Sequence, residues 1–209
     1  MADLESVWTH REEVIYRKLF GDCGQGIYTI SRDDLGSNAA DPRWGFLGVF
    51  ESPPNENRST WLYVTSGLSN PWDDEPEDYS NLEWSGLGVE FVMETPTQWK
   101  WAIKLLHRMI AYEISLAING KPLLAPGGRV GGGGPFVEGT ELTTMLIVPP
   151  DHYPPAFKLD SGRVEFLQFI GITASELEFA KATNSMELLG QLKSNGIYPV
   201  TDPNRRSIL

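Results

Sequence analysis

The chain has 209 residues, of which 41% are hydrophobic and 22% charged. These are ordinary values for a globular protein, and they argue against disorder; a chain of this length can bury one sizeable core. The formal net charge of −11 argues against nucleic acid and anionic membrane surfaces as partners, because both attract clustered Lys and Arg. A basic or amphipathic protein partner fits this acidic chain better.

A single cysteine, Cys23, cannot form an intramolecular disulfide, which favours a reducing compartment. The first residues, Met1–Glu5, are acidic where a secretory signal would be basic and then apolar. No apolar run approaches the roughly 18–20 residues that are needed to span a bilayer. We therefore expect a cytoplasmic protein without a membrane segment.

The first fifty residues begin with a helical pattern and continue with strands. Over residues 3–20, apolar side chains fall mainly on one side of a helix, and Arg11 falls with other polar residues on the opposite side. A short strand is predicted over Ile27–Ile30. A polar loop over Ser31–Asp41 and an aromatic strand over Trp44–Glu51 follow.

Two strands and the longest helix occupy the middle of the chain. Trp61–Ser66 and Leu87–Glu94 alternate with a period of two, which is typical of half-buried strands. Thr97–Ile118 carries a wide apolar stripe at helical spacing. This stripe predicts a largely buried helix that crosses a sheet, with His107 on its narrow polar strip.

The last third begins with a glycine-rich loop over Gly120–Gly139. The capping-box pattern from Thr173 to Glu176 predicts a helix start, and Ser185 is a second candidate cap. The patterned segments are strands over Leu142–Val148 and Arg163–Ile170 and helices over Ala174–Ala182 and Met186–Leu192. The second of these strands has so few polar residues that it should lie centrally. The order of elements predicts one α+β domain.

Residues that could carry catalysis are sparse. The three histidines are far apart in sequence and have no Cys or His at ligand spacing, so no metal or cofactor is predicted. The glycines of Gly131–Gly134 lack the GK[ST] and the following helix of a phosphate-binding loop. Cys23 and His107 are the residues that an enzyme could use, although structural roles are commoner for both. We therefore expect no enzyme activity and keep Cys23 with His107 as the enzymatic alternative.

The stretch from Ser59 to Trp99 contains eight acidic residues and no Lys or Arg. Its acids lack the spacing of a calcium-binding loop, so a solvated acidic loop is the simplest interpretation. Aromatic residues are interleaved with these acids, however, and such mixtures are typical of protein interfaces. These aromatic residues are Trp61, Tyr63, Trp72, Tyr79 and Trp84. At least half of them should still belong to the core.

Four segments of this chain read WLYVTSGLSNPWDD, SGLGVEFVMETP, WAIKLLHRMIAYEI and SGRVEFLQFIGITASELEFA. They resemble the suppressor of fused family, in particular its bacterial single-domain members. They occur in the order and spacing of the family, and the similarity extends from about Gly26 to Asp202. The resemblance implies one α+β domain over residues 1–209, with a core over about 26–202. It also implies a central, mostly antiparallel sheet flanked by helices, and the helix over residues 3–20 should pack on this core.

The resemblance also implies a function in protein binding. In animals, the family's domain is a negative regulator of Hedgehog signalling that holds a short peptide of Gli-type transcription factors as an added strand. Tyr63 and Asp74 match, in the pattern WxYxxxGLSxxxxD, residues that contact that peptide. Bacterial members are similar to immunity proteins of polymorphic toxin systems, which neutralise a cognate toxin by binding it.

The expected function is therefore a non-enzymatic protein-binding module, an immunity protein that neutralises a basic toxin. Charge complementarity between an acidic inhibitor and a basic toxin would raise their rate of association. A peptide-binding regulator or adaptor that works by strand addition is the alternative. The predicted partner-binding residues are Tyr63, Trp72, Asp73, Asp74 and Tyr79.

Overall fold

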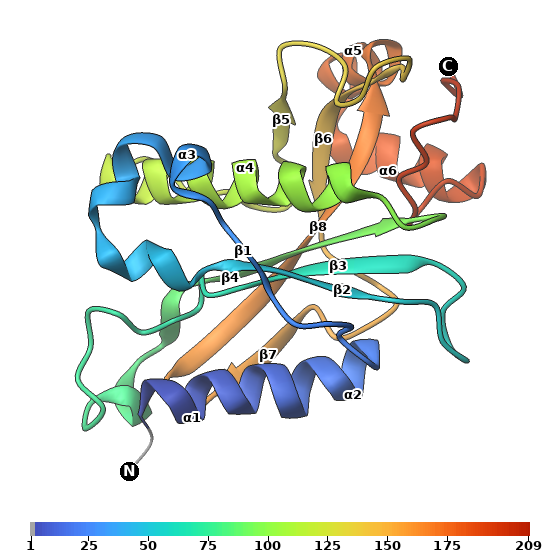
Figure 1. Cartoon of the computed structure of the whole chain (residues 1–209). Coiled ribbons are helices and arrows are strands. Elements are labelled where there is room, and N and C mark those ends of the chain that lie inside the picture. Colours follow the sequence, from blue (N-terminus) through green and yellow to red (C-terminus); the bar gives the residue numbers. More distant parts are fainter. Residues whose placement is uncertain (1–2) are drawn as a thin grey trace.

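The computed structural model describes residues 3–209, apart from the side chains at positions 39, 40, 42 and 45. An eight-stranded sheet runs through it in the order β1-β2-β3-β4-β8-β6-β5, and β7 pairs with the first part of β8 (Figure 1). The strands are β1 (Tyr28–Thr29), β2 (Gly48–Ser52), β3 (Trp61–Ser66), β4 (Trp84–Thr95), β5 (Arg129–Gly131), β6 (Leu142–Val148), β7 (Ala156–Leu159) and β8 (Gly162–Thr173). The pairing is antiparallel throughout, except between the two long central strands β4 and β8, which are parallel.

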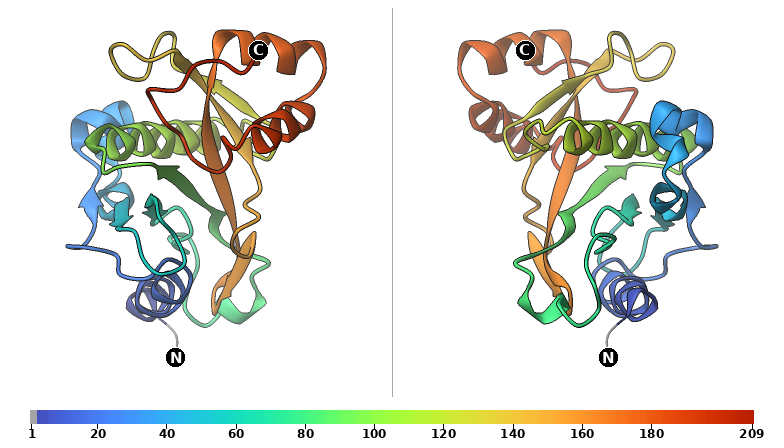
Figure 2. Two further views of the ribbon diagram at one scale, coloured as in Figure 1. Left: turned by 90° about the vertical axis from the view of Figure 1, so that its right-hand side faces the viewer. Right: turned by 90° about the vertical axis from the view of Figure 1, so that its left-hand side faces the viewer.

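Helices cover both faces of this sheet (Figures 1 and 2). The N-terminal helix, made of α1, η1 and α2, packs on one face, and α4 crosses the other. The α-helices are α1 (Leu4–Thr9), α2 (Arg17–Phe20), α3 (Arg32–Leu35), α4 (Lys100–Ile118), α5 (Ala174–Ala182) and α6 (Ser185–Ser194). The other helical forms are the π-helix η1 (His10–Tyr16) and the 3-10 helices η2 (Gly36–Ala40), η3 (Pro42–Phe46) and η4 (Tyr79–Asn81). The predicted fold class, an α+β domain with a mostly antiparallel central sheet flanked by helices, is confirmed.

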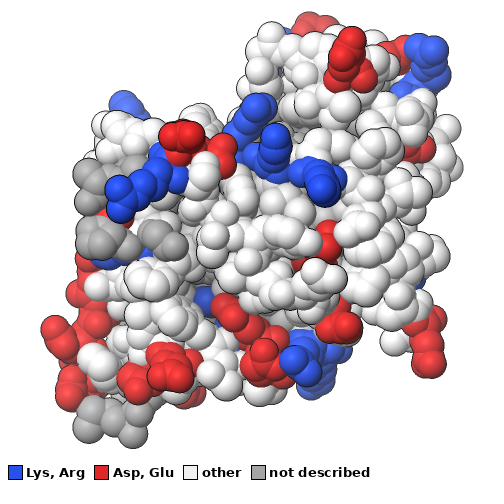
Figure 3. All heavy atoms as spheres, in the orientation of Figure 1, with Lys and Arg blue, Asp and Glu red and all other residues white. Residues whose placement is uncertain are grey.

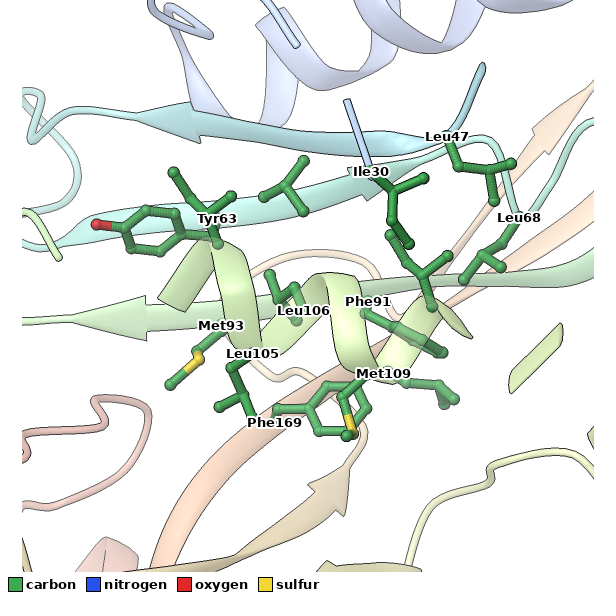
Figure 4. Close-up of a cluster of buried hydrophobic side chains, with 14 of the residues drawn as sticks. Ile30, Leu47, Tyr63, Leu68, Phe91, Met93, Leu105, Leu106, Met109 and Phe169 are labelled. Atoms are coloured by element: carbon green, nitrogen blue, oxygen red, sulfur yellow. The ribbon is translucent and has the colours of Figure 1, made fainter. Parts of the chain in front are cut away.

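The largest apolar cluster lies between α4 and the sheet (Figure 4). Leu106 and Met109 of α4 face Phe91 and Phe169, whose rings meet edge to face at 5.0 Å between centroids. Phe91 and Phe169 lie on the neighbouring strands β4 and β8, so one contact connects the two central strands under the helix. The odd-numbered residues of β4 thus face α4, as the alternating pattern predicted.

The even-numbered residues of β4 face the N-terminal helix. Val92 packs there with Tyr16, Phe20 and Phe166 in a second apolar cluster. At the far end of the sheet, Leu146, Val148, Ile170 and Ile172 pack against α5 and α6. The central strands are therefore buried on both faces, which explains their near-continuous apolar sequence.

Two predicted segments were wrong in their local structure. Ser31–Asp41 is helical and not a loop, because the Ser31 hydroxyl accepts the Asp34 N–H and caps α3. The strand predicted over Trp44–Glu51 begins only at Gly48, because the 3-10 helix η3 occupies the chain up to Phe46. β5 and β7 were not predicted.

The helix predictions hold with corrections at their starts. α4 begins at Lys100, with Trp99 as its cap residue, instead of at Thr97. The capping box of α5 is present as predicted, with Glu176 bonded back to the Thr173 N–H. The cap of α6 is Asn184, not Ser185, because the Asn184 side chain accepts two backbone N–H groups.

Arg11 and His107 were predicted on polar helix faces, and both are buried. Arg11 is 1% exposed. The π-helical i→i+5 bonding of η1 places more residues in each turn than an α-helix, which changes the side chains that face the sheet. His107 is 6% exposed, and its Nε2 donates to the Tyr28 carbonyl at 2.9 Å. A buried ring with a backbone partner is compatible with the apolar surface around it.

Candidate functional site

The β3–β4 loop, residues 67–83, is held in place by one buried carboxylate. Glu90 of β4 is fully buried and accepts the backbone N–H groups of Gly67 and Ser69, each at 3.0 Å. It also accepts the hydroxyl of Ser69 at 2.7 Å and that of Thr65. These four hydrogen-bond donors stabilise the buried Glu90 carboxylate, and they fix the start of the loop to the central strand β4.

Arg11 connects the same network to the N-terminal helix. Its guanidinium donates to the Asn70 side chain at 2.7 Å and to the Ser69 hydroxyl at 3.1 Å, and it lies 4.0 Å from the Glu90 carboxylate. Glu12 accepts from Arg11 at 3.0 Å and from the Ser66 hydroxyl. The helix, the loop and β4 are therefore joined by charge-assisted hydrogen bonds away from water.

A close backbone approach completes this frame. A Cβ at Gly86 would lie 2.3 Å from the carbonyl oxygen of Asn70, and the φ of Gly86 is +55°. Both features require glycine. The two glycine-containing segments that carry the family resemblance, SGLSN and SGLG, thus meet at this point in space.

Three aromatic side chains lie on the frame and form what we call the aromatic cluster: Trp8, Phe46 and Trp72. Their ring centroids are 5.8 Å apart for Trp8 and Phe46, 6.0 Å for Phe46 and Trp72, and 6.2 Å for Trp8 and Trp72. The Trp8 ring N–H donates to Asn70 at 2.9 Å, which orients the cluster on the loop. Phe46 is 58% exposed, so the cluster presents an apolar surface to water.

Charged side chains surround the aromatic cluster. Arg43 pairs with Asp41 and Asp73, and its guanidinium lies 5.1 Å from the ring centroid of Trp44. Hydrogen bonds from Arg43 lower the pKa of Asp41, so this carboxylate stays ionised. What we call the acidic rim consists of six exposed acids at the start of the N-terminal helix and in residues 73–78 of the loop. They are Asp3, Glu5, Asp73, Glu75, Glu77 and Asp78.

Charged side chains are unevenly distributed over the face of the molecule drawn in Figure 3. Figure 3 shows acidic side chains gathered where Figure 1 places α1 and the β3–β4 loop. Lys100, Lys104 and Arg108 lie exposed along α4, on the other face of the sheet. A basic partner would therefore be attracted to the end of the molecule that carries the aromatic cluster.

Three of the five predicted site residues lie together at this end. Trp72 is half-buried in the aromatic cluster, and Asp73 is exposed beside Arg43. Asp74 follows, half-buried, in the same loop. The structure therefore places these residues on one surface, as their sequence proximity implied.

The two predicted tyrosines are buried instead. The Tyr63 side chain is fully enclosed in the α4 cluster, where its hydroxyl accepts the Trp99 N–H at 2.7 Å. Figure 4 places it at the opposite end of this cluster from Leu68, which belongs to the β3–β4 loop. Tyr79 is 4% exposed and packs against Val7. Neither side chain is accessible to a partner in this structure.

Sequence reasoning did not identify Trp8, Phe46, Arg11 or Arg43 as site residues. Trp8 matched the apolar stripe of a helix, and Phe46 lay in a segment predicted as a strand. Only tertiary contacts bring these residues to the acidic loop. The sequence carried no signal for Arg11, because a polar side chain in a helix gives no sign of a partner that is distant in the chain.

The enzymatic alternative relied on Cys23 and His107, and the structure does not bring them together. Cys23 packs at the edge of the cluster beneath the N-terminal helix, whereas His107 belongs to α4 on the other face of the sheet. Burial raises the pKa of the Cys23 thiol to about 11, so it is protonated at neutral pH. Among residues 3–209, no three His, Cys, Asp or Glu side chains are placed to bind a metal ion. No described helix has the length and apolar character of a membrane span.

A family model described as suppressor of fused protein (SUFU) matches residues 44–206. The chain belongs to this family. Comparison with curated proteins finds no match. Two solved structures with similar folds extend over nearly the whole chain. The Sufu–Fu complex crystal structure has a TM-score of 0.69 and 19% identity, covering 97% of this chain and 90% of that chain. A protein described as a SUFU homologue from Neisseria gonorrhoeae FA 1090 has a TM-score of 0.64 and 21% identity, covering 99% and 96%.

Drosophila Suppressor of Fused has a TM-score of 0.61 and 19% identity, with 77% of this chain and 42% of that chain covered. The family segments YVTSGLSN and GLGVEF contribute Thr65, Ser69 and Glu90 to one buried network. In this SUFU-family chain, the segments that carry the resemblance therefore maintain the fold directly beneath the aromatic cluster.

Proposed function

We propose that this chain is a non-enzymatic protein-binding module, and that the aromatic cluster with its acidic rim is the contact surface. The observation that carries the proposal is the exposed aromatic cluster on a rigid buried frame. Aromatic side chains on a preorganised surface lose little entropy on binding and are frequent in interface hot spots. The solved complex of Sufu with Fu, a structure of similar fold, supports a binding role in this family.

The partner that this surface fits is a basic protein. The acidic rim lies on the same helix and the same loop as Trp8 and Trp72 of the cluster, and Asp73 remains exposed although it is paired with Arg43. Opposite charges accelerate encounter and the apolar centre supplies affinity after water is excluded. We propose specifically a basic toxin that this chain neutralises as an immunity protein in the cytoplasm of a bacterium.

Strand addition is less well supported as the binding mode. The two end strands of the sheet, β1 and β5, have two and three residues. Short edge strands offer few free backbone groups to an incoming peptide. A contact through side chains of the aromatic cluster therefore agrees better with this geometry.

Substitution of Phe46 by Ser tests the proposal. Phe46 is exposed, so its loss should leave stability unchanged while it weakens partner binding by about 30-fold, as expected for a hot spot worth about 2 kcal/mol. The purified chain is first used to capture its partner from a lysate of the encoding organism. Binding of the two purified proteins is then measured by calorimetry. Ile118→Ser is the matched control, because Ile118 is 57% exposed at the end of α4.

A second arm tests the acidic rim. Reversal of charge at Asp73 and Asp74 to Lys should slow association and weaken its dependence on salt. Cells that express a toxin-like neighbouring gene should grow when they also express the wild-type chain, and they should not grow when they express Phe46→Ser instead. If Phe46→Ser and the double reversal both bind like the wild type, the proposed surface is wrong.

A further inference from the structure

A cavity of about 560 Å³ borders the end of α2. Figure 1 shows that α2 is at the opposite end of the N-terminal helix from α1, which carries Trp8 of the aromatic cluster. Five parts of the chain that are distant in sequence line the cavity: residues 17–21, residues 55–60 with Leu62, Glu94 of β4, residues 152–153 and residues 199–200. Its size is that of a small-ligand site. Phe20 and Leu62 provide an apolar floor beneath several polar groups.

Glu94 presents an unfilled hydrogen-bond acceptor in this cavity. The residue is 3% exposed, and its Oε2 accepts the hydroxyl of Thr60. Its Oε1 accepts no hydrogen bond from the residues that the structure describes. The nearby Arg58 guanidinium does not fill the site, because it donates to backbone carbonyls, among them those of Phe20 and Thr60.

Tyr153 also lines this cavity, and its side chain carries a hydrogen-bond donor without a partner in the described part of the chain. Its hydroxyl is buried and has no hydrogen-bond partner among the described residues. The ring is held edge to face by Phe20 at 5.1 Å and by Phe166 at 5.7 Å between centroids. Burial, and then the Glu94 carboxylate, raise the pKa of the Tyr153 phenol, so it keeps its proton. A buried hydroxyl without a partner is costly and calls for a specific explanation.

We propose that this cavity binds a carboxamide group. The amide N–H would donate to Glu94 and the amide C=O would accept from Tyr153, while the attached carbon chain lies on Phe20 and Leu62. Glu94 disfavours a carboxylate placed against it, although Arg17 and Lys18 also line the cavity, and Arg58 disfavours an ammonium at the same place. A neutral amide meets neither repulsion. The carboxamide comes either from an Asn or Gln side chain of a protein partner or from a small amide. This inference does not depend on the proposed function, because the aromatic cluster lies at the other end of the helix.

Titration with propionamide, monitored by NMR, tests the chemistry. Propionamide should shift the signals of residues that line the cavity and saturate at millimolar concentration. Butanone has similar size and a carbonyl but no N–H donor, so it should bind at least fivefold more weakly, the loss of about one hydrogen bond. Equal binding of the two compounds, or no saturable shift with propionamide, would overturn the proposal.

Tyr153→Phe separates binding from structure. This variant removes the unpaired hydroxyl, so it should weaken propionamide binding about fivefold while the protein becomes no less stable to urea. Tyr112→Phe, on the exposed part of α4, is the matched control and should change neither quantity. A Tyr153→Phe variant that is destabilised and binds propionamide as the wild type does would show that the hydroxyl is structural.

A second probe identifies the source of the carboxamide. The peptide Gly-Gln-Gly should bind at least tenfold more tightly than propionamide if the natural ligand is a side chain of a protein. Equal affinity of the two would identify a small amide as the ligand. A Gly-Leu-Gly peptide that binds as tightly as Gly-Gln-Gly would contradict recognition of the carboxamide.

Discussion

Glu113 is a buried acid without a basic neighbour. It lies on α4, is fully buried, and accepts the Leu124 N–H through both carboxylate oxygens, at 3.0 and 3.3 Å. No ion pair to it occurs within the described part of the chain. Burial raises its pKa from 4.5 to about 7, although the hydrogen bond from Leu124 opposes this shift.

The raised pKa predicts that stability depends on pH. Between pH 4.5 and 7 the folded state holds a proton on Glu113 that the unfolded state has released, so the free energy of unfolding falls as pH rises. The loss is on the order of 3 kcal/mol above pH 7. Glu113→Gln should remove this loss of stability with rising pH. The free energy of unfolding of the variant should exceed that of the wild type at pH 8 and nearly equal it at pH 5. Urea unfolding at both pH values measures this, and identical pH dependence in the two proteins would contradict it.

The N-terminal helix acts as a structural element through Arg11. Arg11→Leu leaves the Glu90 carboxylate buried without its basic neighbour and removes the donors to Ser69 and Asn70. We expect a loss of about 3 kcal/mol in the free energy of unfolding, the usual cost of breaking a buried charge pair. Arg17→Leu is the control. Its ion pair with Glu13 is exposed, so its loss should cost less than about 1 kcal/mol.

Chemical denaturation of both variants provides the measurement. An Arg11→Leu protein as stable as Arg17→Leu would mean that the network does not hold the helix to the sheet. If the network does hold it, Arg11→Leu should also weaken partner binding, because Trp8 of the aromatic cluster lies on the same helix.

Elements with a clean period could be predicted from the sequence. Trp61–Ser66 is a strand over the predicted bounds, because alternation is typical of a strand in a sheet. Leu142–Val148 is also a strand over the predicted bounds, as its apolar run before Pro149 indicated. Arg11 and His107 could not be placed, since a polar side chain in a helix gives no sign of a distant partner. The Tyr63 position matched a family motif, yet its hydroxyl contacts Trp99, a contact that no local pattern encodes.

The candidate site was predicted only in part for the same reason. Trp72, Asp73 and Asp74 are neighbours in sequence, so their common surface could be expected. Trp8 and Phe46 join them through folding of segments that are far apart in the chain.

On the scale of the whole molecule, the C-terminal segment is tied to the sheet by one buried pair. Arg205 binds both oxygens of Glu176 at 2.6 Å and donates to the Gly171 carbonyl of β8. Burial alone would raise the pKa of Glu176, but hydrogen bonds from Arg205 and Thr173 outweigh it and lower the pKa. This pair therefore stabilises the fold above pH 4.5, and the contribution is lost as pH falls through the lowered pKa.

Arg205→Met should reduce the free energy of unfolding by about 3 kcal/mol at pH 7, because it leaves Glu176 buried and unpaired. The difference in free energy of unfolding between Arg205→Met and the wild type should become smaller as the pH falls below 4. Arg206→Met is the control, since Arg206 pairs with Glu141 at the surface and should contribute less than about 1 kcal/mol. Thermal unfolding of the two variants distinguishes these outcomes, and equal stability would contradict the role of Arg205.

The parallel pairing of β4 with β8 has a consequence for synthesis on the ribosome. The paired residues Phe91 and Leu167 are 76 positions apart in the chain. At about 5–20 residues per second, β8 is made roughly 4–15 seconds after β4. During that interval one edge of the apolar strand β4 has no partner, which is a risk for aggregation. Nascent chains of this protein should therefore depend on chaperones until β8 has emerged.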